Sequence, residues 1–247
     1  MIIAIDGPSG AGKSTVAKAV ARELGFSCLD TGAMYRAVAW RALQDGVPFD
    51  DDEALGRLAR AHDIAFAHEA GEPVPRRVSI GGIDVTDAIR TAEIDRAVSP
   101  VSAAPSVRAA LVEQQQRIGR AGDYVVEGRD IGTTVFPEAP VKVFLTASAE
   151  ERAHRRVRQN VDRGVGSVDY DEVLTDIRRR SRATSPLRPA DDAVRLDSTG
   201  RYIEEVIEDI CSLALRARER ADVAASASTR CAETLADLMN DQEGSCR

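Results

Sequence analysis

Short apolar runs that alternate with helix-like segments predict an α/β protein. Five runs have the length and composition of buried strands: 2–5, 27–29, 124–127, 141–145 and 193–196. Between them apolar residues recur at helical spacing, which predicts helices over 13–24, most of 31–64, 105–120, 150–160, 169–180 and 202–220. Single strands separated by helices favour a parallel sheet in three layers, with helices on both faces.

The pattern changes between residues 64 and 90. Apolar and polar residues alternate over 78–80 and again over 83–85, and Gly81-Gly82 separates the two runs. A Gly-Gly pair between alternating runs is typical of a β-hairpin. We therefore expect residues 64–90 to form a small antiparallel insert.

The end of the chain differs from the rest. Residues 221–228 are small and polar, which predicts a linker, and 229–239 have the spacing of a short amphipathic helix. We expect one domain over 1–220 and a linker with a mobile tail over 221–247.

Composition excludes several classes of protein. The chain has 247 residues, of which 43% are hydrophobic, enough for a sizeable core, so a wholly disordered chain is excluded. The net charge of -7 argues against a nucleic-acid partner. No stretch approaches the ~18 apolar residues of a membrane span. The four cysteines are far apart, which argues against a zinc site or disulfide framework, and the start lacks the features of a signal peptide. We expect a cytoplasmic protein with no membrane partner.

A phosphate-binding motif follows the first predicted strand and opens the first predicted helix. It comprises Gly7, Pro8, Ser9, Gly10, Ala11, Gly12, Lys13, Ser14 and Thr15. Glycines let backbone N–H groups surround phosphate oxygens, and Lys13 adds a point charge. In this arrangement the Ser14 hydroxyl is a magnesium ligand. The motif predicts ATP binding but no acceptor, because binding modules and switches use the same loop.

Two further polar segments follow predicted strands, where ligands bind in open α/β sheets. After the second strand, Thr31 can cap the next helix and Arg36 can hold a phosphate; an ordinary cap with a solvated arginine is the alternative. After 124–127, Arg129 and Asp130 lie between glycines. They can bind a base or phosphate, or form an internal ion pair.

Residues 178–182 hold the densest basic cluster of the chain. Arginines on a closing loop, such as Arg180 and Arg182, can neutralise a phosphoryl group in transfer. A solvated helix end is the alternative interpretation. Only three of the 33 basic residues are lysines, so an abundance of arginine alone is no sign of function.

Several motifs together resemble the bacterial cytidylate kinase family, in order from residue 1 to about 215. They are Gly-Pro-Ser-Gly-Ala-Gly-Lys-Ser at 7–14, Leu-Asp-Thr-Gly-Ala-Met-Tyr-Arg at 29–36, residues 99–108, Glu-Gly-Arg-Asp-Ile-Gly-Thr at 127–133, Phe-Pro-Glu-Ala-Pro-Val-Lys at 136–142 and Arg-Ala-Thr-Ser-Pro-Leu at 182–187. The resemblance implies a P-loop kinase core, a nucleoside-monophosphate-binding insert and an arginine-rich lid over about 160–188. It also implies a monomeric enzyme that transfers the ATP γ-phosphate to CMP or dCMP with Mg²⁺.

The resemblance also implies a role for individual residues. Lys13, Arg180 and Arg182 would be catalytic, the last two as part of the lid. The CMP base would be read by Ser99, Arg108 and Asp130, and its phosphate would be held by Arg36 and Arg129 with Thr31 nearby.

The lid departs from the family pattern. Only Ser181 separates Arg180 from Arg182, where family members carry an acidic stretch that makes the lid about five residues longer and supplies an aspartate to the CMP ribose. Two alternatives therefore stay open. One is a paralogue that phosphorylates a modified cytidine nucleotide, and the other is a nucleotide-binding module with reduced turnover.

Overall fold

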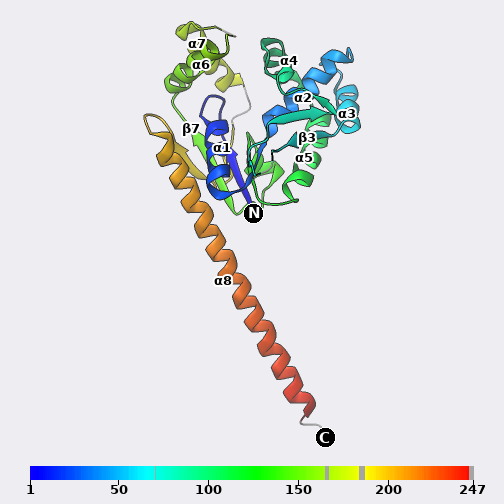
Figure 1. Ribbon diagram of the computed structural model, residues 1–247, viewed down its shortest axis with the longest axis vertical. Helices are drawn as coiled ribbons and strands as arrows, with labels where there is room; N and C mark the ends of the chain where they lie inside the picture. The colour runs from blue at the N-terminus through cyan, green and yellow to red at the C-terminus, as the bar shows by residue number, and fades with distance from the viewer. Residues whose placement is uncertain (70, 165–166, 184–186, 245–247) are drawn as a thin grey trace.

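A computed structural model describes residues 1–69, 71–164, 167–183 and 187–244; the side chains of 163, 180–183, 224–225 and 227–244 lie outside the description. The body is an α/β domain, and a single long helix, α8 (Ile203–Gly244), projects from it (Figure 1). Among the described residues, no helix has the length and apolar character needed to cross a membrane.

A five-stranded parallel sheet forms the centre of the body, as the alternating pattern predicts. Its strand order is β2-β6-β1-β7-β8. The strands are β1 (Ile2–Asp6), β2 (Ser27–Asp30), β6 (Tyr124–Gly128), β7 (Val141–Thr146) and β8 (Val194–Asp197). Because all five run in one direction, the residues that follow β1, β2 and β6 meet at one edge of the sheet.

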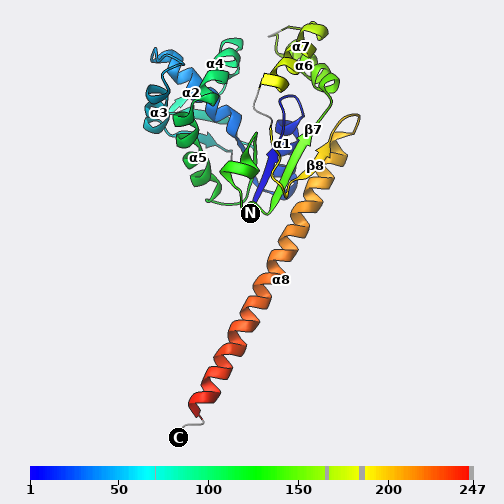
Figure 2. The same cartoon turned by 180° about the vertical axis from the view of Figure 1, so that it is seen from behind.

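Helices cover both faces of this sheet. On one face, α1 (Lys13–Leu24) and the first turns of α8 bury Val16, Val20 and Ile210 against the strands. On the other, α2 (Thr31–Gln44), α3 (Asp52–Ala61) and α5 (Pro105–Gly119) form a second core with Leu29 and Val126. The predicted three-layer α/β class is confirmed (Figure 2 gives the view from behind).

The predicted antiparallel insert is also present. Its strands are β3 (Ile64–Ala67), β4 (Arg77–Ile80) and β5 (Ile83–Asp84), paired in that order. Gly81 and Gly82 turn the chain with φ of +57° and +81°, values that favour glycine. A short turn, η1 (Ala88–Arg90), then leads into α4 (Ala92–Ala103), a helix absent from the elements predicted above.

Two charged helices stand beyond the carboxyl edge of the sheet. They are α6 (Ala149–Arg163), whose N-cap Ser148 accepts a hydrogen bond from the Glu151 N–H at 3.1 Å, and α7 (Tyr170–Ala183). The two helices pack on each other, and the rings of His154 and Tyr170 stack with centroids 4.5 Å apart. Helix α7 and the last residues of α6 fall within 160–188, where the resemblance places a lid.

The predicted linker at 221–228 is wrong, because the backbone is helical throughout this segment as part of α8. Alanine is the commonest residue of 221–228, and it is the best helix former, so local propensity favours continuing the helix. Contacts with the body reach Ala217, which is buried, and Arg218, which lies over the Phe26 ring and pairs with Asp123 at 3.4 Å.

Candidate active site

The phosphate-binding motif forms the loop between β1 and α1. Gly7 has a φ of +149°, and a Cβ there would lie 2.0 Å from the Leu145 carbonyl oxygen, so the close approach of β7 requires glycine. Gly12 is the N-cap of α1 with a φ of +94°. The loop therefore presents the N-terminus of α1, with its unpaired N–H groups, at the carboxyl edge of the sheet.

Lys13 lies in the first turn of α1 and reaches back across the loop. Its Nζ donates a hydrogen bond to the Pro8 carbonyl oxygen at 3.1 Å. Removal from water lowers the pKa of Lys13, while the nearby carboxylate of Glu127 acts in the opposite direction. The ammonium group is thus held at the mouth of the loop.

Glu127 is a site residue that the sequence reasoning missed. It ends the buried run of β6, and its Oε2 accepts a hydrogen bond from the Ser14 hydroxyl at 2.9 Å. Its other oxygen, Oε1, is buried and has no hydrogen-bond partner among the described residues. Burial, followed by the charge of Asp30, raises the pKa of Glu127 to about 7. The signal was available, since Glu127 is a carboxylate at the end of a buried strand.

Asp6 is a second buried carboxylate outside the predicted set. It is the last residue of β1, and its two oxygens accept hydrogen bonds at 2.8 Å from the backbone N–H groups of Ile131 and Gly132. These groups open the turn η2 (Ile131–Val135), directly after Asp130. Asp6 therefore fixes the Arg129-Asp130 segment beside the phosphate-binding loop.

The predicted capping role of Thr31 is wrong. Asp30 is the N-cap of α2, and its Oδ1 accepts a hydrogen bond from the Ala33 N–H at 3.0 Å. Thr31 is the first residue of the helix itself. Its buried hydroxyl donates instead to the Glu127 carbonyl oxygen at 2.7 Å. This hydrogen bond therefore joins the start of α2, directly after β2, to strand β6.

The structure brings four of the predicted acceptor-binding residues into the same region, two of them in an ion pair. Arg108, on α5, pairs with Asp130, while Arg36, on α2, pairs with Asp95 of α4. Arg129 directly precedes Asp130 in the chain, and its positive charge contributes to the lowered pKa of Lys13.

Ser99 does not join these contacts. It is an exposed residue of α4, and its carbonyl oxygen accepts a hydrogen bond from the Ser102 hydroxyl at 3.0 Å. Arg180 and Arg182 are residues of helix α7, and the structure describes their backbone but not their side chains.

Comparison with known proteins decides the family. The sequence model of the cytidylate kinase family matches residues 3–216. The chain belongs to the cytidylate kinase family. It is 49% identical to a cytidylate kinase of Desulfitobacterium hafniense over 215 residues, which cover 85% of this chain and 91% of that one. It is 46% identical to a cytidylate kinase of Saccharophagus degradans, with 87% and 96% of the two chains covered. The chain is thus a nucleoside-monophosphate kinase, a phosphotransferase.

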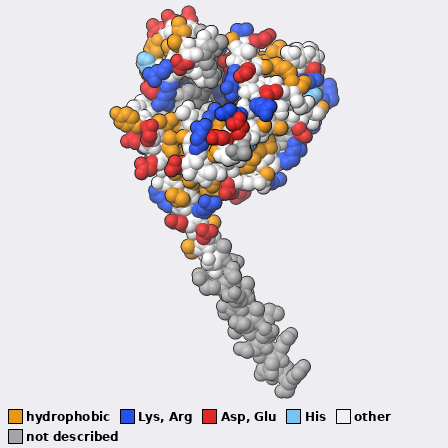
Figure 3. Space-filling model, in the orientation of Figure 1, with side chains coloured by type: hydrophobic (Ala, Val, Ile, Leu, Met, Phe, Trp, Pro, Cys, Tyr) orange, Lys and Arg blue, Asp and Glu red, His pale blue; other side chains and the backbone are white. Residues whose placement is uncertain are grey.

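The surface is hollowed on the side of the molecule that carries α6 and α7 (Figure 3). Figure 3 shows a hollow between the α6–α7 pair and the side of the molecule that carries α2 and α4, with Lys and Arg side chains at its rim. The phosphate-binding loop follows β1, and Asp130 of the Arg108–Asp130 pair follows β6, the neighbouring strand of the sheet. Such an arrangement can hold two nucleotides with their phosphates facing each other.

Proposed function

We propose that the protein transfers the γ-phosphate of ATP to CMP or dCMP, with Mg²⁺, giving ADP and the nucleoside diphosphate. The observation that carries this proposal is a direct linkage between two sites. Glu127 binds Ser14 of the phosphate-binding loop, and Asp6 binds the turn that follows Asp130. Donor and acceptor sites are thus built on neighbouring strands.

On the donor side, the loop N–H groups and Lys13 bind the ATP phosphates. Charge spreads over the transferring phosphoryl oxygens in the transition state, and fixed donors in a partly dry site stabilise it without reorganisation. Lys13 lies in the first helical turn with its Nζ near the Pro8 carbonyl. A phosphate oxygen can take the place of that carbonyl as the acceptor.

Ser14 and Glu127 suit a magnesium ion. Magnesium prefers oxygen ligands, often one or two carboxylates together with waters and phosphates. The Ser14 hydroxyl and Oε1 of Glu127, which accepts no hydrogen bond from the described part of the chain, supply such oxygens. A pKa of about 7 lets a cation displace the Glu127 proton readily. When bound, the ion neutralises charge on the ATP phosphates.

On the acceptor side, the Arg108–Asp130 pair suits cytosine. Cytosine presents an amine donor beside an unprotonated ring nitrogen, which a carboxylate and a guanidinium can bind together. Arg36 and Arg129 bind the monophosphate. This phosphate is already an anionic nucleophile, so its oxygen attacks the γ-phosphorus while the bond to the ADP oxygen breaks, and no general base is needed.

An ADP-release assay with a panel of acceptors tests the proposal. We expect turnover with CMP and dCMP to exceed turnover with UMP and AMP, and chelation of Mg²⁺ by EDTA to abolish it. Hydroxymethyl-CMP is included because of the shortened lid, and a preference for it would identify a specialised acceptor. Absence of ADP release above the rate without acceptor, for every member of the panel, would overturn the proposal.

A further inference from the structure

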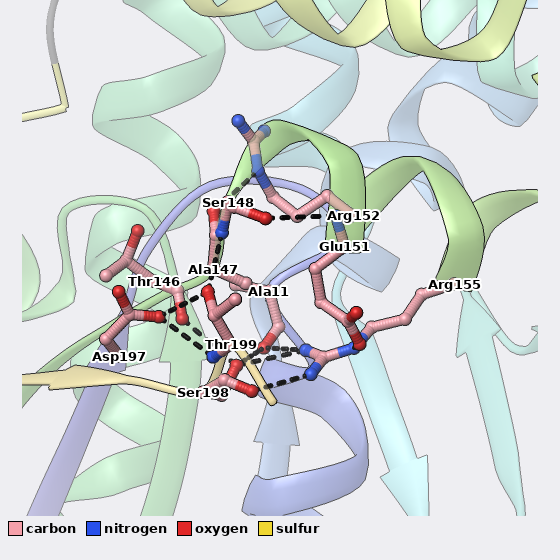
Figure 4. A network of polar contacts seen from close by, with 10 residues as sticks. All are labelled: Ala11, Thr146, Ala147, Ser148, Glu151, Arg152, Arg155, Asp197, Ser198 and Thr199. Atoms are coloured by element: carbon pink, nitrogen blue, oxygen red, sulfur yellow. Dashed lines mark hydrogen bonds and ion pairs between the residues drawn. The ribbon is translucent and has the colours of Figure 1, made fainter. Parts of the chain in front are cut away.

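The phosphate-binding loop and two other elements are joined by a polar network centred on Arg155 (Figure 4). The elements are the loop itself, helix α6 and the segment that follows β8. Arg155 lies on α6, Ala11 on the loop and Ser198 directly after β8. No nucleotide-binding role follows from the sequence motifs for Arg155, which is one of many arginines in the chain.

Two donors converge on the carbonyl oxygen of Ala11. Arg155 Nη1 donates to it at 3.1 Å, and the Ser198 hydroxyl lies 3.2 Å from it and shares its single proton with the Thr146 carbonyl oxygen at 3.0 Å. Ala11 and Ser198 are both buried. A buried carbonyl that accepts hydrogen bonds from the side chains of two other elements is held firmly.

The remaining N–H groups of Arg155 also have protein acceptors. Nη1 donates in addition to the Ser198 hydroxyl oxygen at 3.0 Å, Nη2 to the Ser198 carbonyl oxygen at 2.9 Å, and Nε to Oε1 of Glu151 at 2.8 Å. Four of the five guanidinium donors are therefore engaged by the protein. Arg152, one turn earlier, points away from this network in Figure 4. Arg155 is thus suited to hold the loop rather than to bind a nucleotide.

Fixing the Ala11 carbonyl also fixes the N–H of Gly12. A peptide bond is planar and trans, so its C=O and N–H point in opposite directions. With the Ala11 carbonyl facing Arg155 and Ser198, the Gly12 N–H faces the other side of the loop. A Cβ at Gly12 would lie 3.4 Å from Arg155 Nη1, so α6 closely backs the loop here.

We propose that Arg155 is a positioning residue for the phosphate donor: with Ser198 it orients the Ala11–Gly12 peptide so that the Gly12 N–H binds ATP. Because α6 packs on α7, the same contact ties the base of the lid region to the phosphate-binding loop. This inference rests on the proposed function for the identity of the donor, but it concerns how the donor is bound.

The test compares Arg155→Lys, Arg155→Met and Ser198→Ala, with Arg158→Met as a matched control. Arg158 is an exposed arginine on the same helix. Equilibrium binding of ATP is measured without acceptor, followed by KM for ATP and for CMP, kcat and thermal unfolding. We expect Arg155→Met to weaken ATP binding and raise the KM for ATP about tenfold, the effect of losing a charged hydrogen bond in the loop. The KM for CMP should stay unchanged in Arg155→Met. The control variant Arg158→Met should keep the wild-type ATP affinity and both wild-type KM values.

A double-mutant cycle separates positioning from general stability. Arg155 and Ser198 share one acceptor, so the effects on ATP affinity of Arg155→Lys and Ser198→Ala should combine non-additively. The proposal is wrong if the variants lower only the unfolding temperature and keep ATP affinity, or if KM rises equally for both substrates. If Arg155→Met does not fold, Arg155→Lys and Ser198→Ala carry the test. Wild-type protein that binds ATP without phosphorylating any acceptor would overturn the proposed function alone.

Discussion

Replacing Asp130 by asparagine tests whether this carboxylate selects the acceptor base. Asp130 pairs with Arg108, and their side chains are 27% and 37% exposed, so both partners are partly shielded from water. Asparagine keeps the shape but removes the charge, and one of its two polar atoms becomes a donor. The amide NH₂ group of asparagine cannot accept a hydrogen bond from the cytosine amine. It can donate one to the carbonyl that uracil carries in place of that amine.

The size of the effect follows from the exposure of the pair. A hydrogen bond to a charged group contributes roughly 1.5–3 kcal/mol when buried, and partial exposure places this one near the lower end. About 1.5 kcal/mol corresponds to roughly a tenfold change. We therefore expect kcat/KM for CMP to fall about tenfold or more, and kcat/KM for UMP to stay equal or to rise. The KM for ATP should change little.

Steady-state kinetics with CMP and UMP, at fixed saturating ATP, measure the change in preference. The control is Asp45→Asn, which removes a carboxylate paired with Arg41 at 2.7 Å at the far end of α2. The control should leave the CMP/UMP ratio as it is in the wild-type protein. An Asp130→Asn variant with the same ratio would refute base reading by Asp130. Its pair with Arg108 would then be an internal ion pair.

Three further predictions address the loop, the lid and the tail. Lys13→Ala should lower kcat on the order of 10²-fold, the effect of one preorganised electrostatic contact, with unchanged circular dichroism; near-normal turnover would contradict a catalytic role. Inserting five residues, mostly acidic, after Arg180 should lower the KM for CMP about tenfold by restoring a ribose contact and should sharpen discrimination against dCMP; unchanged values would mean that the short lid is functionally silent. A chain of residues 1–220 should keep the thermal stability and kcat of the full chain, since described contacts of α8 with the body end near Arg218, and a large loss of either would assign the tail a role.

Local patterns predicted the elements that bury a regular apolar face. Each of the five strands was visible as a short apolar run, and the insert was visible from alternation around Gly81 and Gly82. Helix α4 was missed because it contains Pro100, which weakens its helical pattern, although Thr91 is a favourable N-cap for it. The linker was wrong because small residues are compatible with both a linker and a helix.

Tertiary pairing explains what the sequence could not show about the site. The phosphate-binding loop is local, so its residues were identified together. By contrast, Glu127 reaches Ser14 across 113 positions of the sequence and Arg155 reaches Ala11 across 144. No spacing rule joins such residues, and in a chain this rich in arginine the residue type gives no further signal. The strand order, which places β6 and β7 on either side of β1, makes these contacts interpretable.

The carboxylates at the sheet edge differ in how much of their hydrogen-bonding capacity the protein uses. A buried carboxylate is costly unless donors satisfy its oxygens. Both oxygens of Asp6 receive backbone N–H groups, and burial still raises its pKa. Glu127 receives one hydroxyl, keeps one oxygen without a described partner and has its pKa raised to about 7. A cation near Glu127 therefore relieves a larger electrostatic cost than one near Asp6. This difference explains why Asp6 can serve as a fixed link to the Arg129-Asp130 segment, while one oxygen of Glu127 remains able to bind a cation.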